Sequence, residues 1–246
     1  MKKLLLTFLA AIPLLAETPT PKPNVDVGLS SALGHIADGG QWTTTFTLVN
    51  LDTVPASYTL TFYADDGSPL TLGLAGIGAV TTTSGLLPVN GSTVLQTTGG
   101  PSLHQGWAYL DTVQSVGAQA IFKSHVDGRA DYEAAVAIDQ GSTSIEIAFD
   151  NSGGYFTGVA IANTDSIFAA NVTVTFFDPQ GVQTGSGNFA LPPSGHVSLL
   201  LNLSYPITAG LTGTVEFTSD NGSIVGLGLR FNPSGPFTST TSFTLD

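Results

Sequence analysis

After its first 25 residues, the chain alternates apolar and polar residues over short runs that are separated by turn-forming residues. Val, Thr, Phe, Leu and Ile dominate the runs, and Gly, Asn, Asp and Pro dominate the intervals between them. The turn signals recur at 65–67, 90–91, 127–128, 150–153, 178–181 and 220–222. A period of two residues with regularly spaced turns predicts short antiparallel strands, and no helical period interrupts it. The pattern therefore predicts an all-β sandwich or barrel.

An internal repeat divides the predicted strands into two sets. The matching segments, in chain order, are 42–50 with 155–163, 58–67 with 172–181, 87–91 with 191–195, and the strands that end at Phe122 and at Phe231. The order of the segments is the same in both sets, as expected for a duplicated domain. The repeat predicts two tandem antiparallel β-sandwich domains related by internal duplication, over residues 26–140 and 141–246.

Each set also contains the same pair of turn motifs. A Thr-Phe-aromatic strand end closes on a glycine at 61–67 and at 175–181, and a Leu-Pro-x-x-Gly turn follows at 87–91 and at 191–195. This arrangement resembles the immunoglobulin-like β-sandwich modules of bacterial extracellular proteins, in tandem. The resemblance covers nearly all of the chain after its N-terminal segment. It implies the fold and no particular activity, because such sandwiches host many functions.

The N-terminus has the three parts of a secretory signal peptide. Lys2 and Lys3 give a positively charged start, residues 4–15 form an apolar stretch, and Ala16 is a small residue suited to a cleavage site. The apolar stretch is too short to span a bilayer as a helix. Residues 17–25 are rich in Pro and Thr and predict a stiff, extended spacer. We expect residues 1–16 to be a signal peptide and the chain to be secreted to the periplasm, the cell surface or the medium.

Composition excludes several classes of partner and of site. The formal net charge is −12, and only four basic residues (Lys22, Lys123, Arg129 and Arg230) lie outside the predicted signal peptide. A nucleic-acid partner requires a basic patch that neutralises phosphates, so none is expected. The absence of cysteine excludes disulfide bonds and thiolate metal sites. No segment after the signal peptide is predicted to span a membrane.

Comparison of the two repeats predicts which side chains face a core. Alternate residues of a strand point to opposite faces. A set of alternate residues that is apolar in both copies is therefore interpreted as facing the core. Trp42 and Tyr155 are inward by this criterion, as are Ala108 and Leu110. Matching Phe122 with Phe231 gives a further inward set: Ala118, Ala120 and Phe122 in one copy, and Leu227, Leu229 and Phe231 in the other. Gly228 and Arg230 are then outward.

The same comparison turns Trp107 and Tyr109 outward on domain 1. If their strand forms a hairpin with the next one, Ile121 lies beside them, with Gln119 and Lys123 at the margins. An apolar surface of this kind is normally covered by another part of the protein or used to bind a partner. One hypothesis is that the segment before Trp42, residues 75–86 or the other domain covers it. The other is a flat platform that stacks on the sugar rings of a polysaccharide or contacts another surface protein.

Residues 125–133 place polar side chains at every second position around an Asp-Gly turn. Asp127, Asp131 and Glu133 could supply carboxylate oxygens to a calcium ion. Arg129 lies among them, and Asp-Gly is a common hairpin turn, so we favour an ordinary ion-paired hairpin. The four histidines form no close pair in the sequence and are interpreted as scattered surface or loop residues. No other cofactor is predicted.

An Asn-x-Asp motif follows a predicted strand in both copies. The residues are Asn50 with Asp52 and Asn163 with Asp165. Asn and Asp side chains hydrogen-bond the backbone of their own turns. We therefore expect a structural role for this pair rather than a binding role.

No motif of a known catalytic site appears in the sequence. Gly-x-Ser-x-Gly, His-Glu-x-x-His and the phosphate-binding loop are all absent. The sequence therefore favours a secreted, non-enzymatic structural or adhesive module. One alternative is a carbohydrate-binding protein that uses the aromatic platform on domain 1. Another is a hydrolase with an unrecognised carboxylate site, because carboxylates from distant loops can meet in a fold.

Overall fold

The computed structural model describes residues 30–245. The predicted signal peptide and spacer, residues 1–16 and 17–25, lie outside this range. Within it, the regular structure is almost entirely antiparallel β-strand, with one short α-helix and one 3-10 turn. The prediction of an all-β fold is confirmed, and the arrangement of the sheets is consistent with a β-sandwich.

We call the part that carries strands β1 to β10 the N-terminal unit and the part that carries β11 to β19 the C-terminal unit. The elements of the N-terminal unit are β1 (Ser30–Asp38), β2 (Trp42–Asn50), β3 (Ala56–Ala64), β4 (Leu72–Leu74), β5 (Gly78–Val80), β6 (Thr82–Leu87), β7 (Ser92–Gln96), β8 (His104–Thr112), β9 (Val116–Ser124) and β10 (Tyr132–Asp139). The elements of the C-terminal unit are β11 (Ser144–Asp150), β12 (Phe156–Asn163), β13 (Ala170–Phe177), β14 (Gln183–Leu191), β15 (His196–Leu200), α1 (Leu201–Ser204), the 3-10 turn (Pro206–Thr208), β16 (Thr212–Ser219), β17 (Ile224–Phe231), β18 (Phe237–Thr240) and β19 (Ser242–Thr244).

The N-terminal unit is one eight-stranded sheet folded around a core. Its strand order is β6-β3-β8-β1-β10-β9-β2-β7, and a short pairing of Ala32 with Asp139 and of Leu33 with Ile138 joins the two halves. Side chains of both halves, such as Leu60 and Phe46, share one buried cluster. Burial of these apolar faces against each other is the main force that holds the unit together.

The C-terminal unit has two separate sheets around a second core. Their strand orders are β14-β13-β16-β11-β19 and β15-β12-β17-β18. The first four strands of each sheet correspond, position by position, to the two halves of the N-terminal unit, β6-β3-β8-β1 and β7-β2-β9-β10. The two units therefore share one strand topology.

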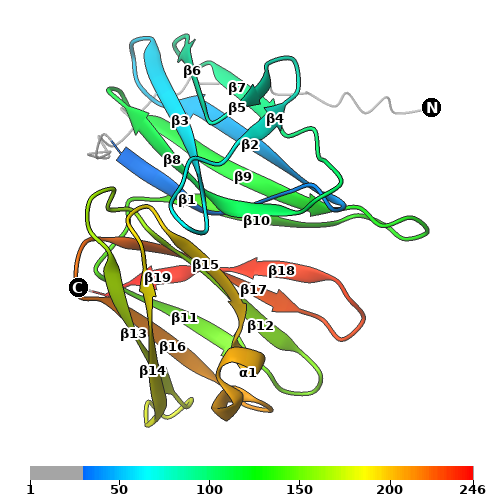
Figure 1. Cartoon of the computed structure of the whole chain (residues 1–246), viewed down its shortest axis with the longest axis vertical. Helices are drawn as coiled ribbons and strands as arrows, with labels where there is room; N and C mark the ends of the chain where they lie inside the picture. The colour runs from blue at the N-terminus through cyan, green and yellow to red at the C-terminus, as the bar shows by residue number, and fades with distance from the viewer. Residues whose placement is uncertain (1–29, 246) are drawn as a thin grey trace, which may run out of the picture.

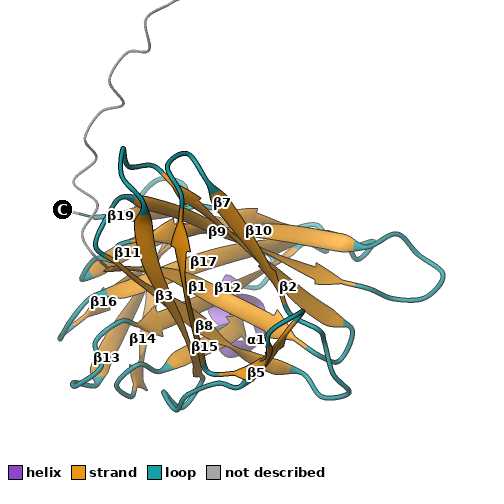
Figure 2. Ribbon diagram, turned by 90° about the horizontal axis from the view of Figure 1, so that it is seen from above, coloured by secondary structure: helices purple, strands orange, loops and turns teal. Residues whose placement is uncertain are grey.

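The two units pack against each other, one above the other in Figure 1. The contact joins β1, β8 and β10 of the N-terminal unit to β12, β15, β17 and β18 of the C-terminal unit, and a buried cluster of Ala32, Trp107, Ala162 and Val225 fills part of it. Seen from above, the strands of the N-terminal unit lie over those of the C-terminal unit (Figure 2). Strands β1 and β12 are consequently buried on both faces along most of their length.

The asparagine at the end of the second strand performs the same task in both units. Asn50 Nδ2 donates to the carbonyl oxygen of Pro88 at 3.0 Å, and Asn163 Nδ2 donates to that of Pro192 at 3.0 Å. In both cases Oδ1 accepts a hydrogen bond from the backbone N–H two residues later, at 2.8 Å and 3.0 Å. These bonds tie the Leu-Pro-x-x-Gly turn to the end of the strand. The predicted structural role of the motif is confirmed.

The predicted facing of β17 is wrong by one residue. Phe122 lies opposite Thr44 in the β2–β9 pair, whereas Arg230 lies opposite Thr157 in the β12–β17 pair. The structural counterpart of Phe122 is therefore Arg230 and not Phe231. A shift of one residue moves every side chain of a strand to the other face.

The facing of β17 was predicted wrongly because the more apolar face of this strand packs on the other unit. Leu227 and Leu229 contact the core cluster of the N-terminal unit. Gly226 instead faces the core of its own unit, where an added Cβ would collide with the Ile145 side chain. The inward assignments of Ala108, Leu110, Ala120 and Phe122 in the N-terminal unit are confirmed by their burial in its core.

Replacement of Asn163 tests the tie between strand and turn. Asn163 is completely buried and makes three hydrogen bonds to the backbone, so Asn163→Ala should lower the free energy of unfolding by about 3 kcal/mol. Asn188→Ala, at an exposed position of β14, is the matched control and should change it by less than about 0.5 kcal/mol. Urea unfolding followed by circular dichroism measures both. Equal effects of the two substitutions would contradict the assigned role.

Candidate functional site

The structure does not bring the five residues of the predicted aromatic platform together. Trp107 and Tyr109 lie on β8, between β3 and β1, whereas Gln119, Ile121 and Lys123 lie on β9, between β10 and β2. The two strands belong to opposite halves of the folded sheet and do not form the expected hairpin. The short connection between them crosses from one half to the other, as sandwich connections do.

Trp107 points away from its own core, as predicted, but the C-terminal unit covers it. Its side chain is 1 % exposed, its ring stacks on Tyr63 with centroids 5.1 Å apart, and Tyr109 meets it edge-on at 6.2 Å. The indole Nε1 donates a 2.7 Å hydrogen bond to the carbonyl oxygen of Ser194. Trp107 is therefore unavailable for stacking on a sugar. On the other half of the sheet, Gln119 is exposed, and Ile121 and Lys123 are half-buried.

A chain of hydrogen bonds, with an exposed carboxylate at one end and two buried histidines, crosses the same interface. Asp65 Oδ1 lies 2.8 Å from His196 Nδ1, and His196 Nε2 lies 3.3 Å from His35 Nδ1. The two imidazole rings are stacked, with centroids 5.3 Å apart. A Cβ on Gly67 would collide with the Pro193 carbonyl oxygen, so glycine is needed where the two turns meet.

The expectation that the histidines are scattered surface or loop residues is therefore wrong for His35 and His196. They are far apart in the sequence and lie in different units, so no spacing rule could pair them. Burial, together with the neighbouring His196 ring, lowers the pKa of His35 from 6.5 to about 3. A charged imidazole is disfavoured there because it would lose its hydration.

Beside this chain, the two units enclose an apolar groove of about 300 Å³, which we call the inter-unit groove. Its lining residues are His35, Ala37, Trp42, Leu103, Gln105 and Phe122 from the N-terminal unit, and Gly158, Val159, Ala160, Ser198, Leu199, Leu200, Leu229 and Phe231 from the C-terminal unit. The volume is at the lower end of the range for small-molecule sites. Sequence reasoning missed the groove because its two walls come from different units.

Aromatic rings of both units pack in a continuous cluster beside the groove. Phe231 stacks on Phe156 with centroids 4.7 Å apart and contacts Phe237 at 5.5 Å. Phe237 in turn stacks on Phe122 and packs against Trp42, at 5.8 Å and 5.6 Å. Trp42, predicted to be inward, is only partly buried and packs at the edge of its core. These ring contacts fix the aromatic wall of the groove.

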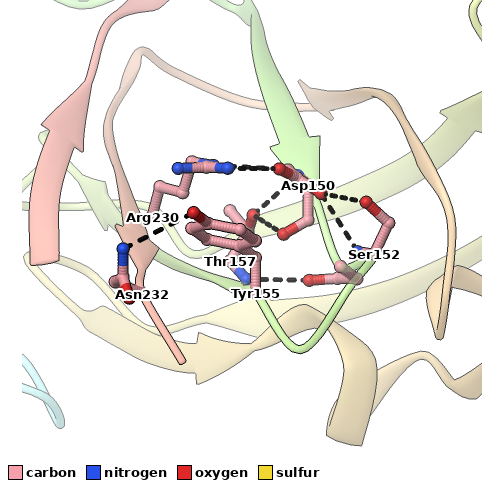
Figure 3. Close-up of polar contacts among 7 residues, drawn as sticks. Asp150, Ser152, Tyr155, Thr157, Arg230 and Asn232 are labelled. Carbon is pink, nitrogen blue, oxygen red and sulfur yellow. Dashed lines mark hydrogen bonds and ion pairs between the residues drawn. The ribbon is translucent and has the colours of Figure 1, made fainter. Parts of the chain in front are cut away.

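Polar contacts close the end of the C-terminal sandwich (Figure 3). The Arg230 guanidinium lies over the Tyr155 ring at 3.6 Å from its centroid, and Nη2 and Nε donate to Asp150 Oδ2 at 2.7 Å and 3.0 Å. Burial raises the pKa of Asp150, but hydrogen bonds from Ser152 and Arg230 outweigh that effect and hold it below its usual value. In the N-terminal unit, Phe122 takes the place of Arg230, so this pairing is specific to the second unit.

Two of the predicted calcium ligands, Asp127 and Asp131, form ion pairs with basic side chains. Asp131 lies 2.6 Å from His125 Nδ1 and 3.2 Å from Lys123 Nζ, and Asp127 lies 3.4 Å from His125 Nε2. Hydrogen bonding to Asp131 raises the pKa of His125. Glu133 is exposed on β10. Among residues 30–245, no group of three or more His, Asp or Glu side chains is arranged to hold a metal ion.

Comparisons with known proteins assign no family to the chain. No family model matches it, and no curated protein is similar to it. One solved structure, of the M60 catalytic domain with the CBM51-1 and CBM51-2 domains of Clostridium perfringens ZmpB, is 8 % identical, with a TM-score of 0.16. The match covers 77 % of this chain and 32 % of that one, and a likeness so low supports no argument. None of the helices in residues 30–245 has the length and apolar character needed to cross a bilayer.

The burial of His35 predicts that the folded state loses stability in mild acid. The folded-state pKa, about 3, is below the unfolded value of 6.5, so between these two values the unfolded chain binds more protons than the folded one. The free energy of unfolding should therefore fall as the pH drops below 6.5, by about 2 kcal/mol between pH 7 and pH 5.

Urea unfolding of the wild type, His35→Gln and His104→Gln as a function of pH separates the contribution of His35 to the free energy of unfolding from that of the other titrating groups. His35→Gln should lose the acid-dependent component. The exposed His104→Gln variant should keep the full dependence of the wild type. Parallel pH profiles for the wild type and His35→Gln would show that His35 contributes nothing to the dependence.

Proposed function

We propose that the chain is a secreted, non-enzymatic structural or adhesive module of the cell surface or extracellular space. It consists of two duplicated β-sandwich domains, over residues 26–140 and 141–246, that act as one rigid body. The observation that carries the proposal is the burial of both faces of β1 and β12. Strands that are buried on both faces belong to a sheet that is covered on both sides, and this requires the two units to remain in contact.

The matching details of the two units support duplication. Their sheets have the same strand order. Thr44 Oγ1 donates to the Ala37 carbonyl oxygen in one unit, and Thr157 Oγ1 donates to that of Asp150 in the other, each reaching seven residues back. Two unrelated sandwiches have no reason to share these buried side-chain bonds. A repeated domain explains both.

The two units differ at corresponding positions of their second strands. Gly158 and Ala160 of β12 line the inter-unit groove. The corresponding positions of β2 are Thr45 and Thr47, which are half-buried. The contact between the units therefore uses small residues of the second unit that the first unit does not repeat.

Secretion is supported by the signal-peptide pattern of residues 1–16. The acidic composition favours solubility. A sugar-binding function is not proposed, because Trp107 is buried in the interface between the units and Gln119, Ile121 and Lys123 lie on the other half of the sheet.

Export of the full chain from a bacterial host tests the proposal. The chain, followed by a C-terminal tag, should be recovered outside the cytoplasm with Glu17 as its first residue. Leu9→Arg, which interrupts the apolar stretch of the signal, should hold the protein in the cytoplasm, whereas Leu9→Ile should be exported normally. Retention of the wild-type chain in the cytoplasm would contradict secretion. Turnover of a polysaccharide or peptide by the purified exported protein would contradict a non-enzymatic role.

A further inference from the structure

The inter-unit groove has the shape and lining of a site for a flat, apolar molecule. Trp42 and Phe122 from the N-terminal unit and Phe231 from the C-terminal unit contribute aromatic rings to it. Aromatic rings prefer stacked or edge-on neighbours at centroid distances of about 4.5 to 7 Å, so they select planar ligands. A volume of about 300 Å³ is roughly twice that of a cavity known to hold one benzene ring. The groove therefore suits a molecule of two fused rings.

The lining selects against a charged ligand. None of its residues is Asp, Glu, Lys or Arg. His35 is the one titratable side chain among them, and its burial keeps the ring neutral at neutral pH. A charged ligand would lose its hydration in this groove and gain no ion pair in return.

The hydrogen-bond chain across the interface engages one nitrogen of His35 and leaves the other beside the groove. His196 Nδ1 donates to Asp65 Oδ1, and His196 Nε2 lies 3.3 Å from His35 Nδ1. The second nitrogen, Nε2, belongs to a ring that lines the groove. A ligand hydroxyl group can pair with this nitrogen, because a hydroxyl both donates and accepts hydrogen bonds.

Small residues on β12 account for the open space. Gly158 and Ala160 line the groove at the positions that Thr45 and Thr47 occupy in the N-terminal unit. Two threonine side chains at these positions would occupy much of the volume. The space is therefore produced by the sequence of the second unit and is not a general feature of the fold.

From these observations we propose that the inter-unit groove binds an uncharged, planar aromatic molecule that carries a hydroxyl group, of the phenol class. Its rings lie among those of Trp42, Phe122 and Phe231, and its hydroxyl group hydrogen-bonds to Nε2 of His35. The site goes beyond the proposed structural function but rests on it in one respect, because the groove is lined by residues of both units and requires them to remain docked.

The two tryptophans of the chain provide the test. Trp42 lines the groove and Trp107 lies in the buried part of the interface, so the indole N–H signals of ¹⁵N-labelled protein report on both places. Titration with 2-naphthol should move the Trp42 signal saturably, with a dissociation constant of about 100 µM, and leave the Trp107 signal in place. The signals are assigned with Trp107→Phe. No shift of the Trp42 signal up to the solubility limit, or a shift of the Trp107 signal alone, overturns the proposal.

Two comparisons test the chemistry of recognition. Naphthalene has the same rings without a hydroxyl group and should bind about five-fold more weakly than 2-naphthol. The 2-naphthoate anion should bind at least about ten-fold more weakly, because it must lose its hydration. Equal affinity for all three compounds would overturn both the hydroxyl and the charge selectivity.

A pair of matched variants tests the location. Ser198→Phe places a ring in the groove and should abolish the 2-naphthol shift, whereas Ser186→Phe, at an exposed position of β14, should leave it unchanged. Circular dichroism and thermal unfolding establish that both variants fold. If Ser198→Phe does not fold, Gly158→Ala replaces it: its Cβ would lie 3.1 Å from Phe231 and 3.4 Å from Leu200, and it should weaken binding at least about three-fold. Wild-type affinity in a folded Ser198→Phe or Gly158→Ala protein would overturn the assignment.

Discussion

The packing of one sandwich face on another determines most of what is unusual in this structure. Trp107 lies in that contact, where it stacks on Tyr63 and donates to the Ser194 carbonyl oxygen. Burial of an indole ring of this size stabilises the contact by roughly 2 to 3 kcal/mol, and its N–H is satisfied across the interface. The Asp65–His196–His35 chain lies in the same contact. Loss of the contact would expose an aromatic face on one unit and small apolar residues on the other.

The same contact explains the groove. Two twisted sheets cannot touch over their whole faces, because each one curves away from the other toward the edges. Where the side chains are long, as at Trp107, the space is filled. Where β12 carries Gly158 and Ala160, a gap remains between the units, and aromatic rings surround it. The proposed rigid attachment and the proposed site would thus be two results of one packing arrangement.

The sequence was sufficient to predict the class of fold, the turns, the Asn-x-Asp motif and the direction of Trp107 relative to its own core. Each of these depends on local pattern or on a comparison between repeats. The facing of β17 was predicted wrongly because Leu227, Leu229 and Phe231 are apolar for contact with the other unit. The pairing of His35 with His196 and the walls of the groove depend on how the two units dock. Nothing in the local sequence encodes that orientation.

The most direct test of the account is a distance measurement between the two units. The chain has no cysteine, so Val94→Cys on β7 and Thr173→Cys on β13 allow two spin labels to be attached uniquely. Double electron–electron resonance should give one narrow distance distribution, because the account holds the two units in one fixed arrangement. Addition of Trp107→Ala should broaden it. A broad or multimodal distribution in the protein with native Trp107 would show that the units move independently, and would contradict the account.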